Sequence, residues 1–106
     1  MAKSNAIVVY VTAGSKAQAQ DISRQLLEDK LAACVGTIGV ESVFQWKGKI
    51  ENAKEILLII KTKKSLFRKL EKKVKSLHRY EVPEIIALPI ISGHKPYLKW
   101  INDTTA

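Results

Sequence analysis

Cysteine and histidine are scarce in this sequence of 106 residues. Cys34 is the only cysteine, so neither a disulfide within the chain nor a metal knuckle built from paired cysteines is possible. The two histidines are His78 and His94. A structural zinc site needs four converging ligands. We therefore expect any metal site to use other ligands or ligands from several chains.

Long apolar runs are also missing. The first apolar run, Ala6 to Val11, is far shorter than the roughly 20 residues that a membrane-spanning helix needs. It has neither the cationic leader nor the small-residue cleavage site of a secretory signal. We expect a cytoplasmic protein without a membrane span.

Catalytic motifs are absent as well. The sequence has no Gly-rich phosphate loop, no metalloprotease helix and no Ser or Cys nucleophile motif. His78 with Glu84 is the candidate acid–base pair for an enzyme. Because no other catalytic feature accompanies this pair, we predict that the protein is not an enzyme.

The composition is that of one globular domain, with 46% apolar and 26% charged residues, and no linker or repeat divides residues 1–106. The net charge of +8 favours anionic partners, nucleic acid included. However, the lysines of the densest basic block, 61–75, alternate with apolar residues at helical spacing. We interpret them as the solvated side of a helix, and we expect no specific nucleic-acid partner.

Apolar periodicity and turn residues predict seven elements. A strand starts at Ala6, a helix capped by Ser15 runs to about Lys30, and a strand ending at Trp46 is bent or broken at Gly36 and Gly39. The later elements are a turn at Gly48, a strand at 54–62, a helix capped by Ser65 that ends near Leu77 or His78, a strand at 84–90 with Pro89 at an edge or bulge, and a helix starting at Pro96.

The resulting order, β-α-β-β-α-β-α, predicts an α+β fold of the ferredoxin-like type, with a four-stranded antiparallel sheet, two helices on one face and a short C-terminal helix. Two helices cover only one face of such a sheet. The strands at 7–11 and 56–60 are apolar on both parities, so the other face also needs cover. We expect a second copy of the chain to supply it.

Five segments of the chain resemble a known family in sequence and in order. They are "KLAACV" from Lys30, "SVFQWKGKIE" from Ser42, "LLIIKT" from Leu57, "LHRYEVPEIIALPI" from Leu77 and "PYLKWI" from Pro96. The chain resembles the CutA divalent-cation tolerance family. The resemblance implies a homotrimer of ferredoxin-like protomers shaped like the PII signalling proteins, associated with tolerance to copper and other divalent ions. The chain departs from the family pattern at Gly36, Gly39 and Arg79.

The candidate pocket residues are His78, Tyr80, Glu84, Lys61, Cys34 and Trp46, with His78 and Cys34 as candidate metal ligands. Glu81 is a further carboxylate of the same loop, and we treat Lys61 with Glu84 as a candidate ion pair in the cleft floor. Structural roles compete with these assignments. Cys34 could be a small buried apolar residue, and His78 could bond carbonyls at a helix end. Trp46 and Trp100 could pack between protomers, and His94 is expected to lie in an exposed loop.

The sequence and the resemblance together predict a trimeric divalent-cation tolerance protein. It would bind copper or another divalent cation in a metal-response or signalling role, at a pocket where residues 78–84 meet a neighbouring chain. No cofactor is expected to be needed for folding. The alternative is a PII-like trimer that binds a small molecule without specific metal chemistry.

Overall fold

The protein is described by a computed structural model covering residues 5–106. Its elements are β1 (Ala6–Ala13), α1 (Lys16–Glu28), β2 (Cys34–Trp46), β3 (Lys49–Lys63), a 3-10 turn (Lys64–Leu66), α2 (Phe67–Leu77), β4 (Ile85–Pro89) and α3 (Lys95–Thr104). The strands form one sheet in the order β2-β3-β1-β4, and each neighbouring pair is antiparallel. The predicted element order and α+β class are confirmed.

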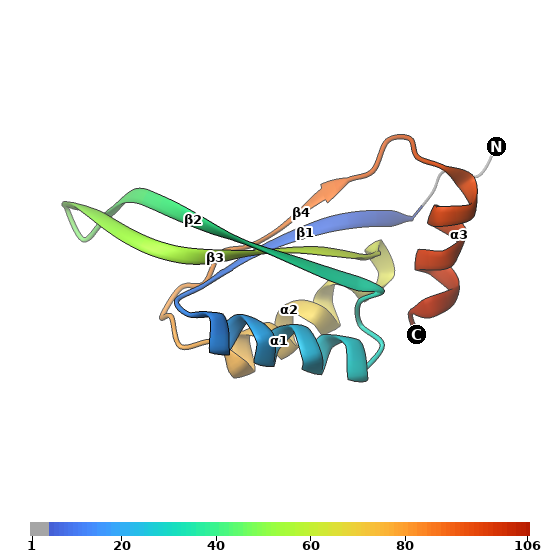
Figure 1. The fold of residues 1–106 in the computed structure, drawn as a ribbon, viewed down its shortest axis with the longest axis horizontal. Coiled ribbons are helices and arrows are strands. Elements are labelled where there is room, and N and C mark those ends of the chain that lie inside the picture. Colours follow the sequence, from blue (N-terminus) through green and yellow to red (C-terminus); the bar gives the residue numbers. More distant parts are fainter. Residues whose placement is uncertain (1–4) are drawn as a thin grey trace.

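One face of the sheet carries the core. Because side chains alternate across a strand, every second residue of β1 and β3 points to α1 and α2, which lie side by side below the sheet (Figure 1). The large, fully buried apolar residues of this layer are Val9, Val11, Ile22, Leu26, Leu58, Ile60, Leu70 and Val74. Each such side chain contributes roughly 1.5–3 kcal/mol through burial.

The opposite face of the sheet is apolar and uncovered. Tyr10 of β1 lies opposite Ile59 of β3 and Ile86 of β4, so the three side chains share this face. No helix among the described residues lies over it (Figure 1). Ile38, Ile86 and Leu88 remain 55%, 50% and 38% exposed there. This open apolar face matches the expectation that a single copy leaves one side of the sheet without cover.

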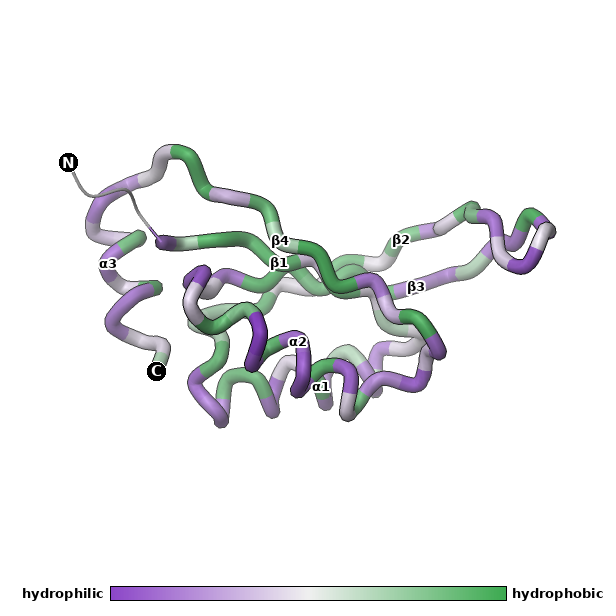
Figure 2. Tube along the Cα trace, turned by 180° about the vertical axis from the view of Figure 1, so that it is seen from behind, coloured by the Kyte–Doolittle hydropathy of each residue, from purple (hydrophilic) through white to green (hydrophobic). Residues whose placement is uncertain are grey.

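The β2–β3 hairpin extends well past α1 and α2 and makes the molecule elongated, 47 × 26 × 22 Å (Figure 1). Its turn is formed by Lys47 and Gly48, which both have positive φ, 51° and 78°. Positive φ at both central residues is the geometry of the tight two-residue hairpin turn. Apolar segments continue along this arm (Figure 2), and Ile50 is 71% exposed. The prediction of a turn at Gly48 is confirmed.

Three local features differ from the prediction. Of the bend or break predicted for β2, a break at Gly36 or Gly39 is absent, because the register with β3 is continuous, and nothing lies within 4 Å of a Cβ added at either glycine. β3 begins at Lys49 rather than at Lys54, since its polar first residues pair with the outer half of β2. Ser65 does not cap α2, because residues 64–66 form a 3-10 turn and the N-cap position falls on Leu66.

Other boundaries agree with the prediction. The Ser15 side chain caps α1 by accepting a hydrogen bond from the Gln18 backbone N–H at 3.1 Å. α1 ends at Glu28, two residues before the predicted Lys30, and α2 ends at Leu77. Pro89 lies on β4, an edge strand, where its missing N–H leaves no ladder bond unmade.

Candidate functional site

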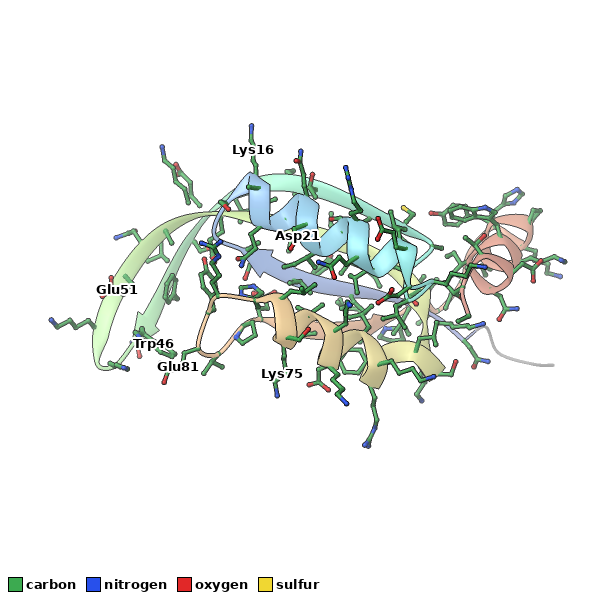
Figure 3. All side chains as sticks on the ribbon, turned by 90° about the horizontal axis from the view of Figure 1, so that it is seen from below. Lys16, Asp21, Trp46, Glu51, Lys75 and Glu81 are labelled. Carbon is green, nitrogen blue, oxygen red and sulfur yellow. The ribbon has the colours of Figure 1, made fainter. Side chains whose placement is uncertain are left out.

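A groove of about 990 Å³ opens between the β2–β3 hairpin and the loop that joins α2 to β4. Its lining combines aromatic, acidic and small polar side chains. The lining residues are Thr12, Ser42, Val43, Phe44, Trp46, Glu51, Asn52, Ala53, Glu55, Arg79, Tyr80, Glu81, Val82 and Glu84. Figure 3 shows Trp46 and Glu51 on the hairpin and Glu81 on the facing loop. The groove therefore brings together two segments that are far apart in the chain.

His78 fixes the start of this loop. The helix stops at Leu77, and His78 has extended backbone geometry (φ −78°, ψ 143°). Its Nε2 donates to the Thr12 carbonyl oxygen at 2.6 Å, and its Nδ1 accepts from the Tyr80 backbone N–H at 3.0 Å. This pattern requires the neutral tautomer with its proton on Nε2. Both ring nitrogens of His78 are thus engaged in holding the loop against β1.

Tyr80 reaches from the loop to β3. Its hydroxyl donates to Glu55 Oε2 at 2.8 Å, and its ring packs beside Gly14, where a Cβ would lie only 3.2 Å from the Tyr80 hydroxyl oxygen. Burial, together with the Glu55 carboxylate, raises the pKa of Tyr80 to about 12, because both disfavour the phenolate. The Tyr80–Glu55 bond joins the loop to the wall of the groove.

Glu55 was not among the predicted site residues. It is only 8% exposed, although it is charged, and it lines the groove from the middle of β3. The alternation of side chains along the strand is the feature of the sequence that could have identified Glu55. Glu55 shares its face of the strand with Leu57 and Ile59, which places a carboxylate at the border of the apolar face.

The groove is acidic on a basic protein. Four glutamates line it, Glu51, Glu55, Glu81 and Glu84, against one cation, Arg79, although the chain as a whole carries a net charge of +8. These four are part of a total of ten acidic residues in the chain. Carboxylates concentrated in a concave site raise the local concentration of cations. The arrangement is suited to a positively charged ligand.

The predicted site residues separate into two groups. Tyr80, Glu84 and Trp46 line the groove, and His78 holds Tyr80 in place. Cys34 and Lys61 face each other across β2 and β3 near the other end of the sheet. There Tyr97 lies next to Cys34. Burial raises the pKa of Tyr97, and the Cys34 sulfur raises it further.

The predicted ion pair between Lys61 and Glu84 is not formed within the protomer. β1 lies between β3 and β4, so the two residues are not on neighbouring strands. Lys61 is opposite Val8, whereas Glu84 precedes Ile85, which is opposite Val11. The two side chains are therefore separated both across and along the sheet.

The metal donors do not converge in one chain either. Among residues 5–106, no group of three or more His, Cys, Asp or Glu side chains is arranged to hold a metal ion. His78 and Cys34, the two candidate ligands, belong to the two separate groups described above.

Within residues 5–106, no helix is long and apolar enough to cross a membrane.

Residues 7–104 match the sequence model of the family described as CutA1 divalent ion tolerance protein. The chain is 43% identical over 99 residues to the divalent-cation tolerance protein CutA of Thermus thermophilus, covering 92% of this chain and 96% of that protein. It is 45% identical over 100 residues to the chloroplastic protein CutA of Arabidopsis thaliana, covering 93% of this chain.

The fold agrees with solved structures of CutA proteins. The crystal structure of CutA1 from Oryza sativa has a TM-score of 0.94 at 45% identity, covering 98% of this chain and 96% of that one. The periplasmic divalent cation tolerance protein CutA from Archaeoglobus fulgidus has a TM-score of 0.92 at 43% identity, covering 93% and 97%. The chain spans 55–63% of the length of the plant and frog relatives. Sequence and fold together place the chain in the CutA1 divalent ion tolerance family.

Proposed function

We propose that the protein acts as a homotrimer in divalent-cation tolerance, in a metal-response or signalling role that involves no catalysis. The observation that carries the proposal is the uncovered apolar face of the sheet, with Ile38, Ile86 and Leu88 at its surface. A contiguous apolar face of this kind favours association with another copy. The family name supplies the link to divalent cations.

The strand order supports a ferredoxin-like protomer within this trimer. In the β-α-β-β-α-β arrangement the first and third strands are central, as β1 and β3 are here. Both helices of the repeat lie on one face, so the other face is free for assembly (Figure 1). We further propose that three such protomers form a PII-like trimer, with the helix-free face of each sheet turned toward the centre.

Light scattering after size-exclusion chromatography tests the assembly. The expected mass is three times the 11.9 kDa of one chain, at micromolar protein concentration. A species with the mass of one chain under these conditions would refute the trimer. The same measurement on Glu28→Gln, which alters an exposed residue at the end of α1, should give the wild-type mass.

Copper or another divalent cation is the ion that we propose, with His78 and Cys34 as ligands. The donors of one protomer do not fit a closed metal site, because His78 and Cys34 belong to separate groups of residues. The proposal therefore requires donors from more than one chain and the release of one His78 hydrogen bond. Imidazole and thiolate are the ligand types that copper favours.

Titration calorimetry with Cu(II) tests the ligand assignment. We expect His78→Ala and Cys34→Ser to weaken Cu(II) binding, whereas His94→Ala should leave it unchanged. His94 is the matched control because it is the other histidine of the chain, is exposed and makes no side-chain hydrogen bond at the start of α3. Equal Cu(II) affinity in wild type and His78→Ala would contradict the assignment of His78.

A small-molecule ligand without specific metal chemistry is the second candidate function. The specific observation in its favour is the groove of about 990 Å³, which is within the size range of small-ligand sites. Its aromatic residues, Phe44, Trp46 and Tyr80, are 41%, 39% and 37% exposed and give an organic ligand apolar surface to contact.

We propose the cytoplasm as the place of action, although the names of relatives refer to the chloroplast and the periplasm. Specific nucleic-acid binding is not part of the proposal. The open face of β3 presents Leu57, Ile59 and Lys61 and no aromatic residue on which a base would stack.

A further inference from the structure

The charge of the protein is concentrated in one segment of the helical layer. Residues 63–79, which include the 3-10 turn and α2, contain eight basic residues and one acidic residue, so they account for +7 of the net charge of +8. The segment of α1 is balanced, since residues 16–30 contain three basic and three acidic residues. The excess positive charge therefore lies on and around α2 rather than over the surface at large.

Six of the cations in residues 63–79 are exposed and unpaired. Within residues 5–106, none of the six forms an ion pair or a side-chain hydrogen bond. By contrast, Lys73 pairs with Asp29 of α1 at 3.2 Å, and Lys63 Nζ donates to the Asn102 carbonyl oxygen at 3.2 Å. The six, which we call the basic face, are Lys64, Arg68, Lys69, Lys72, Lys75 and Arg79.

The positions of these cations oppose the stability of α2. Its first turn has no acidic residue, and Arg68 and Lys69 lie there, at the end where the helix dipole favours negative charge. Lys72 follows Arg68 by four residues and precedes Lys75 by three, so like charges are neighbours on the helix surface. An anion bound along α2 would relieve both kinds of repulsion.

The basic face stays accessible in the proposed assembly. α1 and α2 cover one face of the sheet, and the open apolar face lies on the opposite side (Figure 1). Lys75 projects from α2 on the side away from α1 (Figure 3). Association of copies through the open face therefore leaves the basic face in contact with solvent.

The chemistry of α2 favours a phosphate polymer over a lipid surface. A helix that lies in a membrane interface buries its apolar side in the lipid. In this protein that side is part of the core, because Leu70 and Val74 are fully buried. The cations from Arg68 to Lys75 extend over about 10 Å of helix axis, and duplex DNA carries one negative charge per about 1.7 Å of its axis. Such a row of cations can contact several phosphates at once.

We propose that the basic face binds the phosphate backbone of a nucleic-acid duplex without reading its sequence. Four of its six cations are lysines, whose compact ammonium groups suit phosphates as point charges. Phosphate contacts carry no sequence information. Phe67, the one aromatic residue of α2, packs against the core and is not placed to stack on an unpaired base. This binding is separate from the proposed role in cation tolerance and requires neither copper nor a ligand in the groove.

Fluorescence anisotropy with a labelled DNA duplex of about 20 base pairs tests the proposal on the full chain. With about four phosphates contacted, the logarithm of the affinity should fall against the logarithm of the salt concentration with a slope of roughly −3.6. The affinity should then drop by roughly 300-fold between about 20 and 100 mM salt. A second duplex of equal length and different sequence should bind with an affinity within about twofold.

Removal of three cations locates the binding surface. The triple variant Arg68→Gln, Lys72→Gln, Lys75→Gln should make the salt slope shallower by roughly 2.7 and weaken duplex binding at least about a hundredfold at about 50 mM salt. Circular dichroism and light scattering check its fold and mass. Lys72→Gln alone keeps the test decisive where the triple variant fails to fold. It should make the slope shallower by about 0.9, and an unchanged slope would contradict phosphate contact at α2.

A charge-matched control is available on the neighbouring helix segment. The triple variant Lys16→Gln, Arg24→Gln, Lys30→Gln removes the same two lysines and one arginine from exposed positions on and after α1. It should weaken duplex binding by less than about fivefold at about 50 mM salt. Equal losses in the two triple variants would overturn the proposal, because they would show that net charge and not the basic face governs binding.

Two further outcomes would overturn the proposal. The first is the absence of duplex binding by the wild-type protein at about 20 mM salt. The second is cosedimentation with vesicles of equal parts phosphatidylserine and phosphatidylcholine in the absence of duplex binding, which would identify an anionic membrane as the partner instead. Mass and Cu(II) binding are measured on the same samples. A trimer that binds Cu(II) but no duplex refutes this proposal alone, whereas a monomer without Cu(II) binding refutes the proposed function.

Discussion

Substitutions of His78 best distinguish a structural role of a candidate site residue from a role as a metal ligand. β4 pairs with β1 only as far as Val11, so the Thr12 carbonyl lies beyond the last residue pair and receives its bond from His78 Nε2 at 2.6 Å. The second bond, from the Tyr80 N–H to Nδ1 at 3.0 Å, fixes the loop. Replacing His78 with Ala removes both bonds.

The expected cost of His78→Ala follows from these contacts. Each intramolecular hydrogen bond contributes about 0.5–1.5 kcal/mol, and Thr12 is only 8% exposed, so water replaces the lost donor poorly. We expect the free energy of unfolding to fall by about 2–3 kcal/mol. Urea unfolding of the metal-free protein at fixed concentration measures it. With a slope of about 2 kcal/mol per M, the midpoint should fall by roughly 1 M or slightly more.

Conservative replacements of His78 sharpen the test. His78→Gln can still place an N–H near the Thr12 carbonyl, and His78→Asn can still place an oxygen near the Tyr80 N–H, so each should lose about half as much as His78→Ala. His94→Ala, which alters an exposed histidine, should change stability by less than about 0.5 kcal/mol. If metal-free His78→Ala is as stable as His94→Ala, the two His78 hydrogen bonds do not stabilise the fold.

Three further comparisons test separate parts of the structure. Gly48→Ala places a Cβ at φ 78° and should reduce the free energy of unfolding by about 1 kcal/mol, whereas Gly36→Ala, with open space around it, should not show a strain of this kind; urea unfolding compares the two. Tyr80→Phe should remove the latest phase of phenolate formation in an ultraviolet pH titration. The pKa of Tyr80 in the folded protein is about 12, above its usual value of 10.0. The stabilising effect of Tyr80 is therefore present below pH 10 and is lost as pH rises toward 12. Identical stability–pH profiles for the wild-type protein and Tyr80→Phe would contradict this. Ile86→Lys, at a site 50% exposed on the open face, should convert the trimer to monomer, and an unchanged mass by light scattering would argue against assembly through this face.

The sequence predicted the elements whose signals are local. The cap by Ser15, the turn at Gly48 and the end of α2 each depend on residues within one turn of the chain. The outer part of β3 was missed because residues 49–53 are mostly polar and their partners lie on the other arm of the hairpin. Ser65 was misassigned because a 3-10 turn takes up residues 64–66 before α2 starts.

The candidate site was only partly predictable, since its contacts join distant positions. The loop residues Tyr80 and Glu84 were recognised from their composition, and both line the groove. The bond of His78 spans 66 positions to Thr12, and that of Tyr80 spans 25 positions to Glu55. No periodicity along the chain records such contacts. The grouping of Lys61 with Glu84 failed for the same reason, because it required the strand order.

The hairpin turn sets both the open face and the groove. The pair Trp46 and Lys49 that flanks the turn fixes the register along β2 and β3, and the same register puts Glu55 opposite Val40 and Ile59 opposite Gly36. Side chains alternate with a period of two, so a shift of one residue would move Glu55 away from the groove and Ile59 away from the open face. The site and the proposed assembly surface therefore depend on one structural feature. A change in the turn that alters register should impair both together, whereas Glu55→Gln should affect the groove alone.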